Sequence, residues 1–597
     1  MKPRIFETPA DLFQGAAEEF SKRATQAIKD HGKFCVALSG GSTPKSLFGL
    51  LAGAKFSSLP WKQIFLFWGD ERYVPADNAQ SNFRMTKEAL LSKAPIPAEN
   101  VFRIKTEKSP ADQAAAENDI RLAEGTLAIA TNPALAEQQL TATITALQGQ
   151  FFLPEAYRQR GLARRALGKT AEAIGDLRAA LDILEQRRND VDVDEQRDSA
   201  LDTAAGAAKE LVDLLDRSGD VNATLDAAER TRGRLLTDRL GGGDPAPLSA
   251  TAVAAALPPR TVLVHYTVLP DRVVIATVRH GDGVALARST VGEDELASAT
   301  TALLDAFRTN DPAAGALSER LHALLIAPIA SRLADADQLV IVPDSATARV
   351  PFAALRPAGG TYLIERLPIV LEPNATSYVR ALPRDLARQP LAPRALAVGN
   401  PAIDTTLFPN LAPLPEAESE ANEIAAMRPG TVLLTGAAAT RDRVLAELRT
   451  ATMAHIATHA MLDEADPRQS CLLFTPSGAN RGLITLRDIA AMSLPSSRLV
   501  VLAGCRTAFQ DRAGEGDVRS LAAAFLAAGT SNVIGTLWKV DDPDARQLSV
   551  RFHDALARGH TPAAALREAQ LAMLHSADPS LQSPRAWAAF VIHGTGN

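Results

Sequence analysis

The spacing of apolar and polar residues divides the chain into three regions with different patterns. In the first, residues 34–38 (FCVAL) and 64–68 (IFLFW) are short apolar runs that predict buried strands. In the second, residues 118–245, alanine, leucine, arginine and acidic residues dominate and β-branched runs are few, which predicts helices. In the third, residues 250–597, apolar strands alternate with helical stretches.

The third region predicts an α/β fold built on a mostly parallel sheet. It opens with TVLVHYTVL, RVVIATVRH and VALARSTV, which predict an antiparallel meander. Five nearly continuous apolar strands follow, most of them separated by helical stretches: residues 338–344, 394–400, 453–460, 498–505 and 531–538. Strands of this kind are buried on both faces, so we expect helices on both sides of the sheet. Sites in such sheets form at the carboxyl ends of the strands.

The second region contains one legible tetratricopeptide-like repeat, within residues 155–185. Residues at positions 4, 8, 20, 24 and 27 of the repeat fit its pattern: Tyr157, Gly161, Ala173, Leu177 and Ala180. One unit cannot bury its face alone, so degenerate repeats at 120–149 and 196–236 are its expected neighbours; a plain helical hairpin is the alternative. Solenoid repeats usually bind partner proteins. The glycines and prolines of 241–247 predict a linker to the third region.

The use of basic residues changes between the first region and the rest of the chain. Residues 1–108 hold 11 Lys and 5 Arg, whereas residues 109–597 hold 3 Lys and 44 Arg. Lysine and arginine are both cationic, so the general electrostatics of folding impose no such switch. Two native domains with different surfaces are one explanation. We favour the other, a recent fusion or an artificial join of two coding regions.

Charge and apolar content exclude several classes of protein. A net charge of −6 argues against a dedicated nucleic-acid binder, and no run approaches 18 apolar residues, so no membrane span is expected. The N-terminal sequence lacks an apolar core of signal-peptide length. The three cysteines are too few for a disulfide framework or an all-cysteine metal site, and they suit a reducing compartment. We therefore expect a cytoplasmic protein, and we assign it no cofactor.

The first region carries a turn that suits an anion. Gly40, Gly41, Ser42 and Thr43 follow the predicted strand 34–38 and precede a helical run. A glycine turn between a strand and a helix aims free backbone N–H groups at an anion, and the two hydroxyls add donors. Many such turns bind nothing, so the turn alone does not establish a site.

The motifs LSGGSTPKSLF, FWGDERYVP and SN, in this order, resemble the 6-phosphogluconolactonase family of the glucosamine-6-phosphate isomerase-like fold. The resemblance implies a phosphosugar site at the turn and at the arginine of the DER motif: Gly40, Gly41, Ser42, Thr43 and Arg72. It stops near residue 117, and the family's later histidine motif has no counterpart; His31 is the only histidine before residue 265. Because lactone hydrolysis needs a base that activates water, we expect an inactive fragment with an unfinished sheet edge.

Two residues of the third region are suited to nucleophilic catalysis. His459 lies at the end of the predicted strand 453–460, and Cys505, 46 residues further on, closes 498–505. If these strands are neighbours in the sheet, both side chains emerge at the same edge. An imidazole beside a thiol favours the thiolate, which is the nucleophile. The backbone N–H groups of Cys505 and Ala460 can then stabilise an oxyanion.

Other residues of these types have simpler interpretations. A lone cysteine at a strand end is most often a small buried hydrophobe, and a lone histidine is most often structural, so the pair carries the argument. His455 lies four residues before His459, about 13 Å deeper along a strand, and is interpreted as a core histidine. Cys471 lies in an apolar strand and is interpreted as packing. No CxxC or HExxH spacing supports a zinc site.

A series of motifs runs along the third region in the order LVIVPDSATARVPFAAL, AVGNP, LPEAESEANEIA, AHIATHAMLDEADPRQSCLLF, LVVLAGCRTAF, GEGDVRSLAAAFLAAGTSNVIGTLWKVDD and PRAWAAFVIHG. In this order they resemble the CHAT domain, the caspase-like domain that accompanies tetratricopeptide repeats. They cover roughly residues 255–595, and the resemblance implies a caspase-fold cysteine peptidase with His459 and Cys505 as its dyad. Two residues depart from the family: Ala460 replaces a glycine and Arg506 replaces an acid. The cation either lowers the pKa of the thiol or spoils a substrate contact, and both alternatives stay open.

Three functions remain. We favour a cysteine endopeptidase that acts on a protein or peptide and is regulated or recruited through its helical repeats. The alternatives are a 6-phosphogluconolactonase acting through residues 1–117 and a non-catalytic scaffold; the presence of both dyad residues disfavours the scaffold. The expected domains are 1–117, 118–245 and 250–597. The expected partners are a peptidase substrate, a protein bound by the repeats, and a phosphosugar or phosphate at the N-terminal turn, with no nucleic acid and no membrane.

Overall fold

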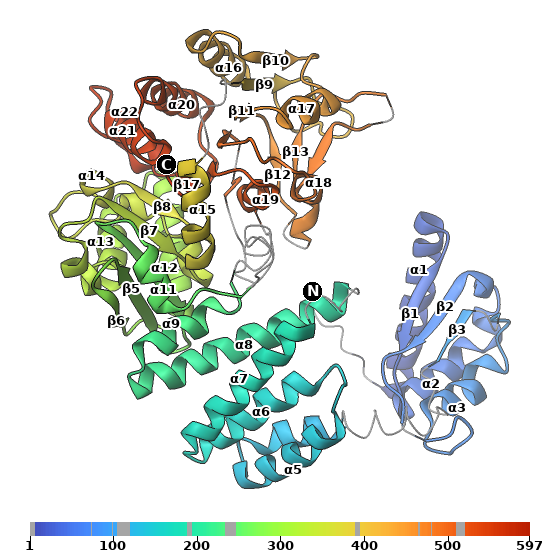
Figure 1. Cartoon of the computed structure of the whole chain (residues 1–597). Helices are drawn as coiled ribbons and strands as arrows, with labels where there is room; N and C mark the ends of the chain where they lie inside the picture. The colour runs from blue at the N-terminus through green and yellow to red at the C-terminus, as the bar shows by residue number, and fades with distance from the viewer. Residues whose placement is uncertain are drawn as a thin grey trace. The chain divides into compact units, whose positions relative to one another are not determined.

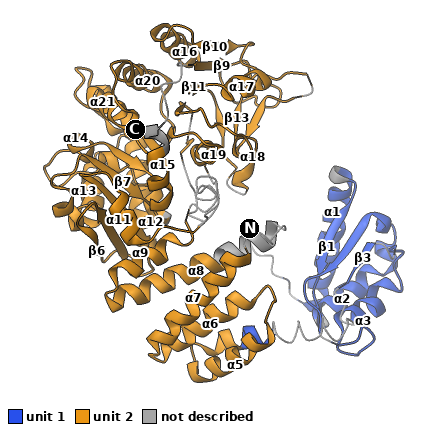
Figure 2. Cartoon of the chain, viewed as in Figure 1, with its two compact units in different colours: residues 1–124 blue, residues 125–597 orange. Residues whose placement is uncertain are grey.

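The computed structural model describes residues 6, 8–72, 74–97, 100–103, 120–187, 194–232, 246–387, 394–463, 466–478, 480–504, 506–508 and 520–597. These residues belong to two compact units, 1–124 and 125–597 (Figure 2). The expected boundary at residue 117 and most of the expected linker 241–247 lie outside the described residues. Across the described part of the chain, no helix combines the length and apolar character needed to span a bilayer.

The first unit is a three-stranded parallel sheet with helices on one face (Figure 1). Its elements are α1 (Pro9–His31), β1 (Phe34–Leu38), α2 (Ser42–Leu51), β2 (Ile64–Trp68), α3 (Asn82–Thr86) and β3 (Val101–Phe102), in the strand order β1-β2-β3. Ile64 and Leu66 of β2 are buried with Leu51 of α2. Phe67 and Phe102 lie on the other face, 38% and 46% exposed, with ring centroids 4.8 Å apart. The two predicted strands are present, and the described residues leave this face of the sheet open.

The second unit begins with a stack of helices. They are α5 (Pro133–Ala146), α6 (Leu153–Ala166), α7 (Thr170–Arg187), α8 (Asp194–Ser218) and α9 (Val221–Glu229). The repeat residues Ala173, Leu177 and Ala180 of α7 are buried. Gly161 of α6 faces them, since a Cβ at Gly161 would lie 3.2 Å from Cγ of Leu177. The small residues therefore allow α6 and α7 to pack closely, as the sequence pattern predicted.

An 11-stranded sheet forms the centre of the remaining part of the second unit, in the order β10-β9-β11-β15-β16-β17-β8-β7-β4-β5-β6. Seven of its ten strand pairs are parallel. The expected meander is β4–β6, which extends the same sheet as an antiparallel edge. The strands are β4 (Thr261–Val268), β5 (Val273–Arg279), β6 (Gly283–Ser289), β7 (Gln338–Val342), β8 (Ile369–Leu371), β9 (Ala395–Pro401), β10 (Val432–Gly436), β11 (Met453–Ala457), β15 (Leu499–Leu502), β16 (Asn532–Thr536) and β17 (Phe590–Gly594).

Helices flank the sheet and a small second sheet lies beside it. The helices are α11 (Ala250–Ala256), α12 (Glu293–Thr309), α13 (Ala314–Leu325), α14 (Leu363–Arg366), α15 (Ala375–Ala387), α16 (Pro415–Met427), α17 (Arg441–Leu448), α18 (Leu486–Ala490), α19 (Leu521–Ala528), α20 (Asp542–Ala557), α21 (Pro562–Leu574), α22 (Pro579–Gln582) and α23 (Pro584–Trp587). The small antiparallel sheet has the order β12-β13-β14, from β12 (Ala460–Met461), β13 (Cys471–Leu473) and β14 (Leu483–Thr485).

The two faces of the sheet are covered by different helices. The connection from β9 through α16 to β10 runs in the opposite direction to that from β10 through α17 to β11, so right-handed crossovers place α16 and α17 on opposite faces (Figure 1). His455 of β11 points to the α16 face, where it contacts Glu420 of α16 and His553 of α20. The expected α/β fold with a largely parallel sheet is present.

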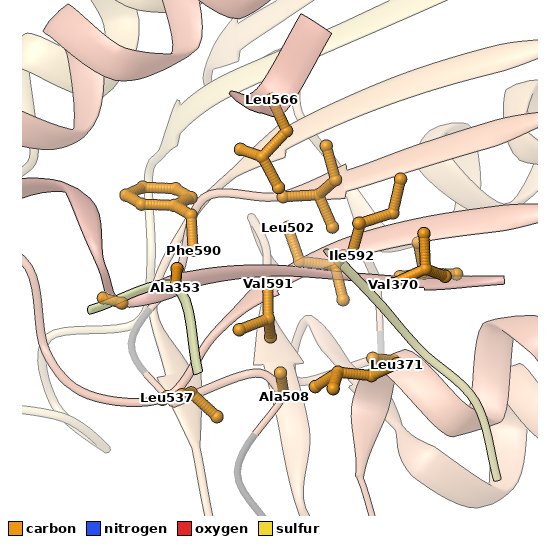
Figure 3. Close-up of a cluster of buried hydrophobic side chains, with 14 of the residues drawn as sticks. Ala353, Val370, Leu371, Leu502, Ala508, Leu537, Leu566, Phe590, Val591 and Ile592 are labelled. Carbon is orange, nitrogen blue, oxygen red and sulfur yellow. The ribbon is translucent and has the colours of Figure 1, made fainter. Parts of the chain in front are cut away.

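Strand β17 joins the two halves of the sheet, since it pairs antiparallel with β16 and parallel with β8. Figure 3 shows the apolar side chains gathered at this junction, which come from segments far apart in the sequence. They include Val370, Leu371, Leu502, Ala508, Leu537, Leu566, Phe590, Val591 and Ile592. Burial of this cluster fixes β8 beside β17 and so unites the two halves of the sheet.

Ion pairs of a buried aspartate join the helical stack to the sheet. Asp216 of α8 contacts Arg272, in the turn after β4, at 2.9 Å, and Arg288 of β6 at 2.8 Å. At the end of α9, Glu229 accepts hydrogen bonds from the backbone N–H groups of Ala375 and Thr376, which begin α15. The helices are therefore fixed to the antiparallel edge of the sheet and to α15.

Candidate functional site

Strands β11 and β15 are neighbours, which was the condition for a shared site at their carboxyl ends. They pair in parallel, and the last registered pair is Ile456 with Leu502. His459 comes three residues after Ile456, and Cys505 comes three residues after Leu502. Both strands end earlier than predicted, at Ala457 and Leu502, because the chain leaves the sheet before either residue. Cys505 itself lies outside the described residues.

The backbone around His459 is held by the small sheet. The N–H of Leu473 donates to the carbonyl oxygen of His459 at 3.0 Å, and the hydroxyl of Thr458 donates to the carbonyl oxygen of Leu473. Ala460, the other expected oxyanion residue, begins β12 and pairs with Leu472. These contacts fix the turn from β11 into β12 and therefore the backbone position of His459.

The imidazole of His459 has one partner that no sequence pattern indicated. Its Nε2 lies 2.8 Å from the carbonyl oxygen of Ala412, in the segment between β9 and α16. A carbonyl oxygen can only accept a hydrogen bond, so Nε2 carries the proton. In the neutral ring this leaves Nδ1 as the acceptor, which is the nitrogen available to a thiol. The ring is partly exposed.

Gly504 brings the end of β15 against the residues on either side of His459. A Cβ at Gly504 would lie 2.8 Å from the carbonyl oxygen of Thr458 and 3.6 Å from Cβ of Ala460. A side chain at this position is therefore excluded, and only glycine allows the two turns to approach so closely. The residue before Cys505 thus lies beside the residues that flank His459.

Two threonines hold the turn that follows β15. The hydroxyl of Thr536, at the end of β16, donates to the carbonyl oxygen of Gly504 at 2.6 Å. The hydroxyl of Thr507 lies 3.2 Å from the carbonyl oxygen of Leu502 and accepts a hydrogen bond from the N–H of Thr536 at 3.1 Å. Arg506, the residue before Thr507, has a φ of 57°, which is uncommon for a residue other than glycine. Strained backbone of this kind clusters at functional sites.

His455 and Cys471 occupy buried positions away from this turn. His455 has 0% exposure, and its Nε2 lies 2.9 Å from Oε1 of the buried Glu420. Its Nδ1 lies 3.2 Å from Nε2 of His553. Cys471 is buried in β13, and burial raises the pKa of its thiol to about 11, which keeps it protonated at neutral pH. Among the described residues, no group of three or more histidine, cysteine or carboxylate side chains is placed to hold a metal ion.

The N-terminal turn and Arg72 lie at the same edge of the first unit's sheet. Gly40 and Gly41 follow β1, and Arg72 follows β2, with Leu38 in register with Trp68. Gly41 is the N-cap of α2, with a φ of 106°. A Cβ at Gly40 would lie 1.9 Å from Oδ1 of Asn82, so glycine is required there.

The other expected phosphosugar-binding residues are Ser42, Thr43 and Arg72. Ser42 begins α2 and Thr43 is exposed, while Arg72 is 65% exposed and 3.9 Å from Oδ2 of Asp70. His31 ends α1, just before β1 begins at Phe34, so it lies at the opposite end of that strand from the turn.

Comparison with protein families gives two matches in different parts of the chain. Residues 315–595 match the CHAT domain. Residues 7–137 match the glucosamine-6-phosphate isomerases/6-phosphogluconolactonase family. The second match ends inside α5, beyond the first unit.

Individual relatives resemble the N-terminal part. The 6-phosphogluconolactonase of Nostoc sp. is 50% identical over 90 residues, which is 15% of this chain and 36% of that protein. The 6-phosphogluconolactonase of Synechocystis sp. is 43% identical over 102 residues, 17% of this chain and 41% of that protein. The chain thus spans about two fifths of the length of these relatives.

A solved structure of the Saccharomyces cerevisiae separase–securin complex covers 71% of this chain and 37% of that one, at 12% identity and a TM-score of 0.45. The two family matches agree with both resemblances seen in the sequence. The chain therefore contains a CHAT domain at residues 315–595 and a 6-phosphogluconolactonase/glucosamine-6-phosphate isomerase domain, matched at residues 7–137.

Proposed function

We propose that this chain is a caspase-like cysteine endopeptidase in which Cys505 is the nucleophile and His459 the base. The observation that carries the proposal is the register of β11 and β15, which sets both residues three positions beyond a paired Ile456 and Leu502. The lack of room for a side chain at Gly504, beside the residues that flank His459, supports it further. The CHAT match supplies the class of enzyme.

The chemistry follows that of cysteine peptidases. Nδ1 of His459 takes the thiol proton, and the thiolate of Cys505 attacks the carbonyl carbon of the scissile peptide bond. The imidazolium then gives its proton to the leaving amine, which releases the first product and leaves an acyl-enzyme. Water, activated by the same imidazole, hydrolyses the thioester. The N–H groups of Ala460 and Cys505 are proposed to stabilise the oxyanion in both steps.

The helical stack is proposed to bind the protein that recruits or regulates the peptidase. Its residues Tyr157, Gly161, Ala173, Leu177 and Ala180 fit the tetratricopeptide pattern, and α6 packs closely on α7. Stacked repeats of this type present extended binding surfaces. The substrate is a protein or peptide.

The test of the nucleophile compares two cysteines of the full chain. Cys505→Ala should lower cleavage of an internally quenched peptide library by roughly three orders of magnitude, since it removes the nucleophile of a covalent route. Cys471→Ala should leave turnover nearly unchanged, because that thiol is buried and its pKa is raised to about 11. Full activity of Cys505→Ala would refute the assignment.

The test of the base compares two histidines. His459→Ala should lose activity about as severely as Cys505→Ala, because residues that act as one unit have non-additive effects. His455→Ala should lower the melting temperature instead, since it leaves Glu420 buried without its neighbour. Activity lost through His455 and retained without His459 would contradict the proposal.

The first unit is proposed to bind a phosphosugar or phosphate without hydrolysing a lactone. The glycine turn, the start of α2 and Arg72 share one sheet edge, whereas His31 belongs to the other end of β1. We therefore expect the full chain to show no enzymatic turnover of 6-phosphogluconolactone. Turnover that Arg72→Ala abolishes would make the protein bifunctional and would overturn this part of the proposal.

A further inference from the structure

The motif AVGNP ends strand β9 and precedes the segment that supplies the carbonyl partner of His459. This segment, residues 402–414, is referred to here as the 402–414 loop. It leaves the sheet after Pro401 and ends at Leu414, the N-cap of α16. Ala412, two residues before that N-cap, places its carbonyl oxygen 2.8 Å from Nε2 of His459. The position of this oxygen therefore depends on how the loop is held at its end.

Asn400 of the motif holds that end. Its Oδ1 accepts a hydrogen bond from the backbone N–H of Leu414 at 2.8 Å. Its Nδ2 donates to Oε2 of Glu418, in the first turn of α16, at 3.0 Å. The side chain of Asn400 thus connects the end of β9 to Leu414, which ends the loop, and to Glu418 in the first turn of α16. The loop is closed at its base by these two bonds.

The backbone at Asn400 is adapted to this task. Its φ is 48°, in the left-handed region, which asparagine enters at lower cost than most residues. The preceding Gly399 lies under α16, where a Cβ would be 2.3 Å from the carbonyl oxygen of Ala417. Glycine therefore lets the helix approach, and the left-handed turn at Asn400 directs its amide toward the start of α16.

Helix α16 has other anchors, so the two bonds of Asn400 are not needed merely to keep it in place. Asp542 of α20 accepts a hydrogen bond from the N–H of Glu416 at 3.2 Å. Arg546 of α20 forms ion pairs with Glu416 and Glu423. Loss of the Asn400 amide should consequently loosen the C-terminal end of the 402–414 loop more than it loosens the helix.

We infer that Asn400 is a positioning residue: it fixes the carbonyl of Ala412 and thereby holds His459 in the tautomer that leaves Nδ1 free. The importance of Asn400 for catalysis rests on the proposed function, in which Nδ1 of His459 is the base. The effect of Asn400 on the imidazole ring is independent of that function, because the contact of Nε2 with Ala412 is present whatever the activity. The two statements can therefore be tested separately.

The test uses four variants of the full chain. Asn400→Gly keeps the left-handed backbone and removes both side-chain bonds. Asn400→Asp keeps the acceptor for the N–H of Leu414 and replaces the donor to Glu418 with a carboxylate that repels it. Asn310→Gly is the matched control, since Asn310 also has a positive φ, 55°, and ends α12. Chains labelled with ¹⁵N-histidine report the imidazole tautomer, and His459→Gln assigns the signal.

The wild-type and Asn310→Gly chains should show His459 with the proton on Nε2. In Asn400→Gly, the two ring nitrogens should shift toward averaged values while the chain stays folded, and Asn400→Asp should keep more of the wild-type signal than Asn400→Gly. With a peptide substrate, kcat of Asn400→Gly should fall about tenfold at an unchanged KM, as expected for a displaced base. Identical His459 signals in Asn400→Gly and wild type would overturn the inference. A wild-type chain that cleaves no peptide would instead refute the proposed function and leave the tautomer comparison valid.

Discussion

Two histidine side chains of the second unit, His593 on β17 and His553 on α20, are kept neutral by burial. Burial lowers the pKa of His593 on β17 to about 4, and among the described residues its Nε2 has no hydrogen-bond partner. Burial, together with the nearby His455 and Arg428, puts the pKa of His553 well below its ordinary value. Such histidines disfavour the folded state once the pH is low enough to protonate them in the unfolded chain.

The effect of His593 on stability has a defined sign. Its folded pKa of about 4 lies below the ordinary value of 6.5, so the unfolded chain binds the proton first. The contribution to stability is fully present above about pH 6.5 and is lost as the pH falls toward 4. At about 1.4 kcal/mol per pH unit, acidification from pH 7 to pH 5 removes about 2 kcal/mol through this residue.

The corresponding variant is His593→Leu. Between pH 7 and pH 5, its free energy of unfolding in urea should fall by about 2 kcal/mol less than that of the wild-type chain. His280→Leu is the control for the loss of a histidine at an exposed position. An identical pH dependence for His593→Leu and wild type would show that His593 is not held neutral.

At the scale of secondary-structure elements, the α6–α7 pair depends on a glycine at its contact. The space at Gly161 is bounded by Leu177 and by the carbonyl oxygen of Ala173, 3.4 Å from a Cβ built there. Gly175 of α7 is in a helix as well, yet nothing lies within 4 Å of a Cβ at that position. The same substitution at these two glycines therefore separates packing from helix propensity.

Gly161→Val should destabilise the helical stack by roughly 1–3 kcal/mol, because its methyl groups overpack the contact with α7. Gly175→Val should be neutral or slightly stabilising, since valine has a higher helix propensity than glycine. Thermal unfolding followed by circular dichroism measures both. Equal effects of the two substitutions would mean that α6 and α7 do not pack as closely as the structure shows.

The parallel sheet of the first unit exposes an apolar face among the described residues. Phe67 and Phe102 stack there at 38% and 46% exposure, beside the exposed Cys35 and Ala37 of β1. Parallel sheets are normally covered on both faces, and exposed apolar patches favour self-association. The sequence-based expectation of an incomplete sheet is consistent with this open face.

Replacement of both rings, Phe67→Ser with Phe102→Ser, should reduce concentration-dependent self-association of the full chain, measured by light scattering, without abolishing the fold of the second unit. Replacement of the buried Leu66 by serine should instead unfold the first unit, since Leu66 is 0% exposed. Unchanged self-association of the double variant would show that this face is covered in solution.

At the scale of the whole second unit, a few buried charges determine how the helical stack is joined to the sheet. Arg272 is the central cation, with contacts of 2.6 Å to Asp213 and 2.9 Å to Asp216, and its side chain is 12% exposed. Both aspartates belong to α8 and are almost fully buried. Removal of one partner of a buried pair leaves an uncompensated charge.

Arg272→Ala should therefore cost roughly 3 kcal/mol of stability and increase hydrogen exchange in α8. Arg308→Ala is the matched control: its ion pair with Asp305 is exposed, so its loss should cost less than about 1 kcal/mol. Unchanged hydrogen exchange in α8 of the Arg272→Ala chain would show that the stack is held to the sheet by other contacts.

Much of the fold could be predicted from the sequence because periodicity reports burial within one element. The apolar runs of β7, β9, β11, β15 and β16 identified the central strands, and the meander β4–β6 was recognised in the same way. The family resemblances were confirmed in both parts of the chain. The assignment of His459 and Cys505 came from their positions at strand ends and stays a prediction.

Only the tertiary structure decided which elements meet. Nothing in the local pattern of Phe590–Gly594 indicated that β17 would pair with β8 and unite the sheet, since that contact joins segments more than 200 residues apart. Likewise, the carbonyl partner of His459 is a backbone atom of Ala412, and any residue type presents such an atom. The pattern of side chains along an element identifies which face of that element is buried. Which other elements it contacts depends on long-range packing. The ring orientation of His459 depends on such a long-range contact, so only the tertiary structure decided it.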